Sequence, residues 1–185
     1  MKRWKPTLIV LGLFALLLAY VLIVEIEKEP PSEGEADPTP SPILDLSLDD
    51  VVTLRIQDGQ RTVRIEHEEA GWRITEPRDE LADSYAVFVP VDDLIRLEAR
   101  MVVLEKTSDL ATYGLHPAAL TLTIETRSGG EERILVGRKT PDGTLFYVQH
   151  AGDARLYAVS SYKMETFFEW LLDPPYQPTP TPESG

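Results

Sequence analysis

The pattern of apolar and polar residues divides the chain into four regions. Residues 7–24 form an unbroken apolar run, and residues 25–42 contain almost no apolar side chains. Short apolar stretches separated by turn residues follow up to residue 173, and the last residues are again rich in Pro and Thr. Only the third region has the periodic apolar positions that build a core. We therefore expect one folded domain at residues 43–173, a Pro/Glu-rich stalk at 25–42 and a disordered tail at 174–185.

The first half of the expected domain begins with the period of two that is typical of half-buried strands. Apolar residues alternate with polar ones at 52–56 and 63–65, and Asp58-Gly59 between them predicts a hairpin with a type I′ turn. A third strand is expected from Gly71 to Ile74, and it ends before Pro77.

A helical period follows between Ala82 and Arg100, with Asp83 as the expected N-cap. Pro90 lies within this segment, which predicts a helix that is kinked or starts late. Residues 101–104 are expected to form a further strand, and a compact connector from Leu110 to Pro117 ends the first half.

The second half has the same succession of patterns. Strands are expected at 120–124, 134–137, 145–148 and 156–159, and Ser160 or Ser161 is expected to cap a last helix from about Tyr162 to Leu172. We therefore predict an α+β fold in which antiparallel sheet, from two meander-plus-helix units, packs with helices. One transmembrane helix is predicted to precede it.

The N-terminal apolar run has the length and the flanks of a membrane anchor. At about 1.5 Å per residue, residues 7–24 span roughly 27 Å, close to the hydrocarbon thickness of a bilayer. Lys2, Arg3 and Lys5 precede the run, which predicts that the N-terminus stays in the cytoplasm. Trp4 and Tyr20 lie near its two ends, where aromatic rings prefer the interface. Residues 1–24 are therefore predicted to be an uncleaved signal anchor, with the domain extracytoplasmic.

A cleaved signal peptide is the alternative interpretation of the same run. Its apolar part would be about 7 to 15 residues long and would end in small residues. Here the run is longer and ends in Val21, Leu22, Ile23 and Val24, which favours the anchor. Since the chain contains no cysteine, a lipoprotein anchor and disulfide bonds are both excluded.

The charge of the chain bears on its partners. The formal net charge is −13, and all 31 acidic residues but only 15 of the 18 basic residues lie beyond residue 24, which gives 15 − 31 = −16 for that part. Such a surface repels nucleic acid and anionic lipid headgroups. We expect a protein partner in the envelope and no nucleic acid.

Candidate catalytic and metal-binding motifs are weak. His67, His116 and His150 do not have the spacing of a zinc motif, and His67 is expected at a solvated strand end. The segment from Gly137 to Thr140 lacks the glycine spacing of a phosphate loop, so a turn is expected there. Five acids near the first helix are interpreted as cap and surface residues: Asp79, Glu80, Asp83, Asp92 and Asp93. We predict no catalytic residue, no metal ligand and no cofactor.

The most distinctive local pattern is Gly71-Trp72 followed by Glu76-Pro77. A Trp on a strand that faces a core buries a large area, so core packing is favoured over a ligand-stacking role.

Several motifs in a fixed order resemble the bacterial domain-of-unknown-function family 4340. They are the segment Gly71–Pro77, the helix that ends in Leu97–Arg100, the connector, and a later segment that includes Gly137 and Tyr147. The residues that carry the resemblance, expected to be structural, are Gly71, Trp72, Pro77, Tyr113, Gly114, Leu115, Pro117, Gly137 and Tyr147. Pro90 departs from the family pattern. The resemblance implies no catalytic residues. Some members of that family are encoded beside genes for ABC-type transporters, which suggests an accessory role in an envelope complex.

These observations favour a non-enzymatic binding module anchored in the membrane. Two alternatives stay open at this point. One is an envelope glycan hydrolase with paired carboxylates, and the other is a weak divalent-cation-binding module that uses acidic loops such as Asp142-Gly143.

Overall fold

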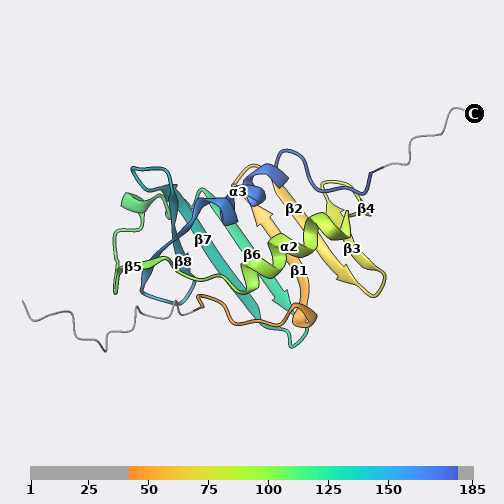
Figure 1. Cartoon of the computed structure of the whole chain (residues 1–185), viewed down its shortest axis with the longest axis horizontal. Helices are drawn as coiled ribbons and strands as arrows, with labels where there is room; N and C mark the ends of the chain where they lie inside the picture. The colour runs from red at the N-terminus through yellow and green to blue at the C-terminus, as the bar shows by residue number, and fades with distance from the viewer. Residues whose placement is uncertain (1–41, 179–185) are drawn as a thin grey trace, which may run out of the picture. The chain divides into compact units, whose positions relative to one another are not determined.

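A single antiparallel sheet of nine strands forms the domain (Figure 1). The structure is a computed structural model that describes residues 42–178. The predicted anchor, the stalk up to residue 41 and the tail from residue 179 lie outside the described residues. The elements in chain order are η1 (Leu48–Asp50), β1 (Val51–Gln57), β2 (Thr62–Glu68), β3 (Gly71–Glu76), β4 (Glu80–Leu81), α2 (Ser84–Ile95), β5 (Met101–Leu104), η2 (Ala111–Tyr113), β6 (Leu120–Thr126), β7 (Glu131–Lys139), β8 (Leu145–His150), β9 (Leu156–Ser160) and α3 (Ser161–Trp170).

The strand order joins the two predicted meanders into one sheet. It reads β4-β3-β2-β1-β6-β7-β8-β9-β5, so the first strands of the two halves, β1 and β6, are neighbours at the centre. In their register Leu54 pairs with Ile124 and Ile56 with Leu122, which puts four fully buried side chains on one face. The predicted α+β class with antiparallel sheet is confirmed.

The segment that follows each helix crosses to the other half. After α2, β5 pairs with β9 at one edge of the sheet. After α3, Tyr176 forms a bridge with Ala82, and the Gln177 amide donates a hydrogen bond of 2.9 Å to the carbonyl of Leu81 at the other edge. At each end of the sheet, a segment from one half therefore pairs with the edge of the other half.

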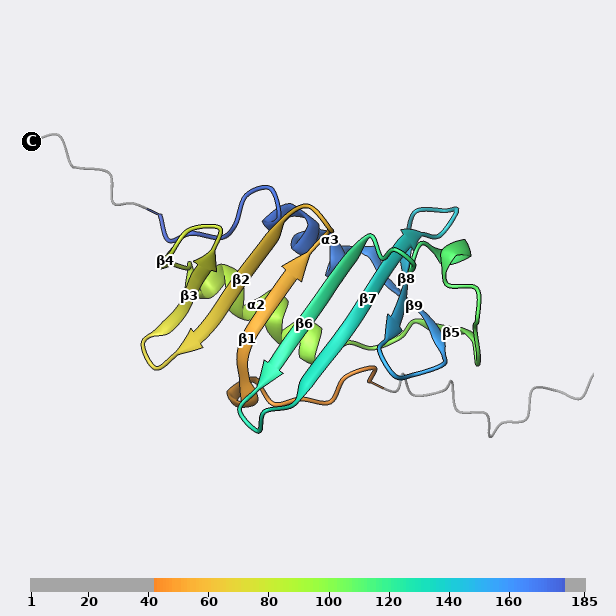
Figure 2. The ribbon, with the colours of Figure 1, turned by 180° about the vertical axis from the view of Figure 1, so that it is seen from behind.

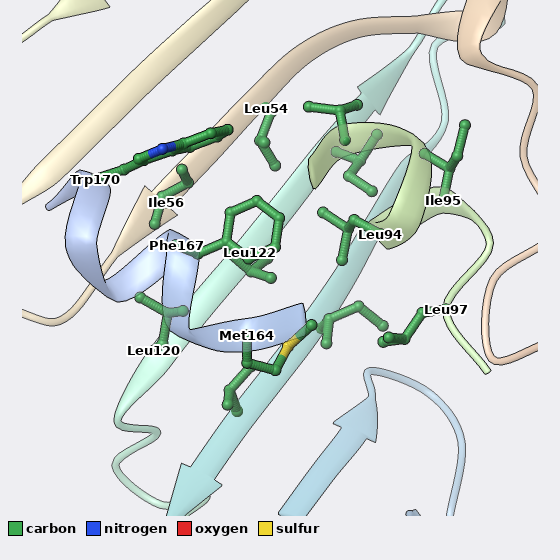
Figure 3. Packing of buried hydrophobic residues seen from close by; sticks show 14 of the residues in the cluster. Leu54, Ile56, Leu94, Ile95, Leu97, Leu120, Leu122, Met164, Phe167 and Trp170 are labelled. Atoms are coloured by element: carbon green, nitrogen blue, oxygen red, sulfur yellow. The ribbon is translucent and has the colours of Figure 1, made fainter. Parts of the chain in front are cut away.

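Both helices pack on the same face of the sheet. They lie in front of the strands in Figure 1 and behind them in Figure 2. Because apolar residues alternate along the strands, one face of the sheet is almost wholly apolar and is buried by the helices. Figure 3 shows Phe167 of α3 pointing toward Leu122 of β6, with Leu94 of α2 beside them. Lys163 of α3 lies 3.2 Å from Asp93 of α2, so the start of α3 is held against the end of α2.

Asp83 caps α2 as predicted, and its carboxylate accepts hydrogen bonds from the amides of Tyr85 and Ala86. The helix begins at Ser84 and continues through Pro90 to Ile95, so the predicted late start is wrong. The strong cap and four buried apolar residues keep Pro90 within the helix despite its missing amide hydrogen.

Two other sequence predictions are corrected by the structure, and one short strand was not predicted. The first hairpin has a loop of residues 58–61 closed by the Asp58 carboxylate, because Gly59 alone takes a positive φ and a type I′ turn needs two such residues. The predicted turn from Gly137 falls within β7, and Thr140 begins the turn instead. The short strand β4 was not predicted.

The predicted tail also starts too early. Residues 174–178 are described and lie along β4, with the carbonyl of Pro175 accepting a hydrogen bond of 2.8 Å from the Asp83 amide. Within residues 42–178, neither helix has the length and apolar content needed to cross a membrane.

Candidate functional site

The nine residues that carry the family resemblance form two separate groups. Six of them lie around the connector between β5 and β6, and the other three lie on or just after β3, near the start of α2. Each group has its own packing chemistry.

The connector covers the face of β7 and β8 that is turned away from the helices. Tyr147 alternates with the core residues Phe146 and Val148, so its ring points to that opposite face. There it meets Tyr113 edge to face, with 5.0 Å between the ring centroids. Leu115 is buried at the same place, just before the cis peptide bond between His116 and Pro117.

Two glycines let the connector approach the sheet closely. A Cβ at Gly137 would lie 2.1 Å from the carbonyl oxygen of Tyr113, and one at Gly114 would lie 2.9 Å from the amide nitrogen of Arg138. Gly114 also ends η2 with φ +71°, a conformation that glycine adopts without strain. The predicted structural role of this group agrees with these contacts.

A polar cluster closes the hairpin between β8 and β9. The Asp153 carboxylate accepts hydrogen bonds from the Tyr157 hydroxyl (2.6 Å) and the Arg155 guanidinium (3.0 Å). Hydrogen bonds from Arg155 and Tyr157 hold the pKa of Asp153 well below its usual range, and burial with the Asp153 contact raises the pKa of Tyr157 to about 12. The Gln149 side chain donates to the Asp153 carbonyl (2.9 Å). These contacts stabilise the turn.

The second family group surrounds Trp72. Its indole is buried and stacks on the His67 ring at 4.2 Å between centroids, so the predicted core role of Trp72 is confirmed. His67 lies near the end of β2 as predicted, but it is half-buried, because its ring stacks on Trp72 and its Nδ1 lies 3.2 Å from the Val51 carbonyl. Gly71 has φ +127°, and a Cβ there would approach the Ser84 hydroxyl at 3.0 Å. Pro77 follows β3 through a cis peptide bond.

A hollow of about 400 Å³ opens beside Trp72. It lies between the end of β4, the first residues of α2 and the proline-containing segment after α3. The residues that line it are Ala70, Trp72, Leu81, Ala82, Asp83, Ser84, Tyr85, Gln177 and Pro178. Sequence reasoning did not find this hollow, because it depends on the return of residues 174–178 to the far edge of the sheet.

An exposed apolar surface continues from the hollow along α2. Tyr85 is 82% exposed, and Leu81, Phe88 and Val89 are each almost half exposed. Tyr85, Phe88 and Val89 have the i, i+3, i+4 spacing of one helix face. We call these four residues the α2 surface. The sequence held a signal for it, since residues 85–91 are apolar on both the inner and the outer side of the helix.

The other helix provides an internal comparison for the α2 surface. Both helices begin with Ser-Tyr, and the residues two positions after the tyrosine, Val87 and Met164, are both buried. At the positions of Phe88 and Val89, α3 instead carries Glu165 and Thr166. Glu165 forms an ion pair with Lys139. A helix of this domain can therefore pack on the sheet with a polar outer face.

The acids near α2 do not converge on a common point. Asp79 pairs with Arg73, Glu80 with Arg78, and Asp92 with Arg96, at 3.0 to 3.1 Å. Asp93 contacts Lys163 and Asp83 caps the helix. Among residues 42–178, no three His, Asp or Glu side chains group as ligands for a metal ion.

Comparison with known proteins gives one result on family. The model of a domain of unknown function, DUF4340, matches residues 72–179, which is more than half of the chain and includes all the motif residues except Gly71. No match was found among curated proteins or among solved structures. The chain belongs to the DUF4340 family.

Proposed function

We propose that this chain is a non-enzymatic protein-binding module, held at the bacterial membrane by its N-terminal segment, with its folded domain facing away from the cytoplasm. The observation that carries the binding role is the α2 surface, with the hollow at its end. Contiguous exposed apolar side chains on a domain of this size mark an interaction site. Leaving Phe88 and Val89 in water has a cost that the polar face of α3 avoids.

The support for the membrane location is in the sequence. The apolar run at residues 7–24 and the three basic residues before it favour a single-pass anchor with the N-terminus inside. The stalk at 25–42, if extended like polyproline at about 3.1 Å per residue, would reach roughly 55 Å. Such a reach would let the domain meet a second envelope protein, which fits an accessory role in an envelope complex.

Site-specific photocrosslinking in the native host tests the binding role. A photoreactive phenylalanine analogue would replace Phe88 in the full chain, and the matched control would carry it at Glu165 on α3. We expect a discrete protein adduct from position 88 and none from position 165. Equal adducts from both positions, or none from position 88, would refute binding through α2.

A reporter fusion tests the location independently. Alkaline phosphatase, which folds only where disulfides form, would be fused after Gly185 of the full chain. We expect an active reporter in the membrane fraction. An inactive reporter in cells that make the full fusion, or activity released into the medium, would refute the anchored, outward topology.

A further inference from the structure

The hollow lies beside the aromatic residue that pairs with the start of α2. The residue before each helix cap pairs with an aromatic residue on the neighbouring strand, Ala82 with Trp72 and Val159 with Phe146. Both aromatic side chains are buried, and the hollow opens outside Trp72, where the first residues of α2 and residues 177–178 line it.

The hollow and the α2 surface form one continuous site. Leu81 and Tyr85 belong to both, so an apolar side chain that entered the hollow would remain in contact with residues on the outer face of α2. A helix that packs along α2 presents side chains at the same i, i+3, i+4 spacing, and one of them can serve as an anchor in a pocket.

The net charge of the chain, and not the acids beside α2, selects the kind of partner. The acids near α2 are already engaged, because Asp79, Glu80, Asp92 and Asp93 form ion pairs and Asp83 caps the helix. The part of the chain beyond residue 24 has a net charge of −16. An anionic bilayer surface would be repelled by these charges, whereas a partner with basic side chains beside its apolar stripe would be attracted.

We propose that the α2 surface and the hollow bind an amphipathic helix of a partner protein whose apolar stripe is flanked by Lys and Arg. One apolar side chain of that helix enters the hollow beside Trp72, and its neighbours cover Phe88 and Val89. The basic residues are attracted by the net negative charge of the chain. This resembles the recognition of an amphipathic helix through its apolar face, with the hollow at the start of α2 as the anchor pocket. The proposal rests on the protein-binding function proposed above and adds the chemistry of the partner.

Three model peptides of about 18 residues test the proposal, because helices of that length are readily formed. One is an amphipathic Leu/Lys helix, the second is the same helix with Glu for Lys, and the third keeps Lys but has Ser for Leu. Each would be titrated against the full chain in a nonionic detergent, with the photoreactive residue at position 88 or at position 165. The local adduct is the readout, so peptide that only enters the micelle does not count.

We expect the Leu/Lys peptide to form an adduct at position 88 and not at 165. For the variant test, the photoreactive residue is moved to position 85. The double substitution Phe88→Glu and Val89→Thr then gives α2 the residues of α3 at these two positions. It should weaken adduct formation by at least about tenfold. The matched control is Tyr162→Ala on α3, which should have no effect. The circular dichroism of both variants should remain that of the parent chain.

Equal reaction of the Leu/Glu peptide, or of the Ser/Lys peptide, would overturn the proposal, because it requires both the apolar stripe and the basic charge. A protein adduct from cells at position 88 without selectivity for Leu/Lys would leave the binding function standing and refute only the basic helix. Selectivity for Leu/Lys without any adduct in cells would refute the binding function in the host instead.

Discussion

Glycine at position 137 is the residue on which the approach of the connector to the sheet depends. The backbone of Tyr113 occupies the space where a side chain on β7 would stand, and Leu115 packs beside it. In the hairpin between β8 and β9, Asp153 brings a carboxylate, a guanidinium and a phenol together in one turn. Both positions allow predictions from a single substitution.

Gly137→Ala is expected to lower the free energy of unfolding by about 3 kcal/mol or more, because its Cβ would meet a backbone oxygen that cannot rotate away. Urea unfolding followed by tryptophan fluorescence measures the change. Gly130→Ala is the control, since its nearest neighbour is the movable Thr126 hydroxyl, and it should cost less than about 1 kcal/mol. An equal loss in both variants would contradict the close approach of the connector.

Asp153→Asn is expected to lower stability at pH 7 by about 2 kcal/mol, since it weakens hydrogen bonds to a charged acceptor. The pKa of Asp153 is depressed in the folded state, so its contribution is complete above the unfolded pKa and is lost as the pH falls through the folded one. The gap between variant and parent should therefore begin to narrow below about pH 4. Urea unfolding from pH 7 to pH 2 measures this difference in the free energy of unfolding. The control Asp45→Asn, at an exposed position, should have the same stability as the parent chain. A gap that widens in acid would contradict the assignment.

At the scale of single elements, α2 combines features that oppose one another. Its cap and its buried face favour the helix, whereas Pro90 removes an amide hydrogen from its interior and Phe88 and Val89 expose apolar surface. The helix α3 contains no proline, and at the positions of Phe88 and Val89 it carries Glu165 and Thr166. We attribute the exposed residues to binding, and Pro90 is a cost that the packing of α2 tolerates.

Pro90→Ala is expected to raise the free energy of unfolding by about 1 to 3 kcal/mol, because it restores a helical hydrogen bond and removes a steric clash. Urea unfolding of the full chain measures the gain. Val89→Ala, an exposed change in the same helix, should alter stability by less than about 0.5 kcal/mol. A clear loss of stability with Pro90→Ala would mean that the proline ring makes packing contacts that outweigh the backbone gain.

For the domain as a whole, the edges of the sheet are treated differently. The β4 edge is covered by a segment with prolines at 174, 175 and 178, which discourages pairing with another chain. At the opposite edge β5 carries exposed Met101, Val102 and Leu104, and a register shift between Val102 and Leu104 interrupts its pairing with β9. An irregular strand of this kind is a poor template for a further strand.

Truncation after Asp173 is expected to lower stability by about 2 kcal/mol, because the backbone hydrogen bonds of Pro175 and Gln177 to the β4 edge are lost together with the stacking of Arg78 on the Tyr176 ring. The bared edge should also increase aggregation, measured by light scattering beside urea unfolding. Truncation after Pro178 keeps these contacts and is the control. If both truncations behave like the parent chain, the segment does not protect the edge.

The sequence by itself was sufficient for the types and the order of most elements. Alternation at residues 52–56 and 120–124 indicated strands, and Asp83 marked the start of α2, because these signals depend on neighbours within a few residues. The family resemblance led us to expect a structural role for Gly137 and Tyr147, but the contacts that they make came only from the structure. The two-residue strand β4 escaped prediction, since a segment that short has no period.

Long-range pairing decided what local patterns could not. Whether the two meanders would form one sheet depended on the register of β1 with β6, and the hollow depended on residues 174–178 returning to β4. The apolar run at residues 7–24 and its basic flank were evident from composition alone, because insertion depends on the summed hydrophobicity of one segment. The sequence showed that residues 85–91 are apolar on both sides of the helix, but which side is exposed was decided by the tertiary structure, because it depends on what packs against the helix from far away in the sequence.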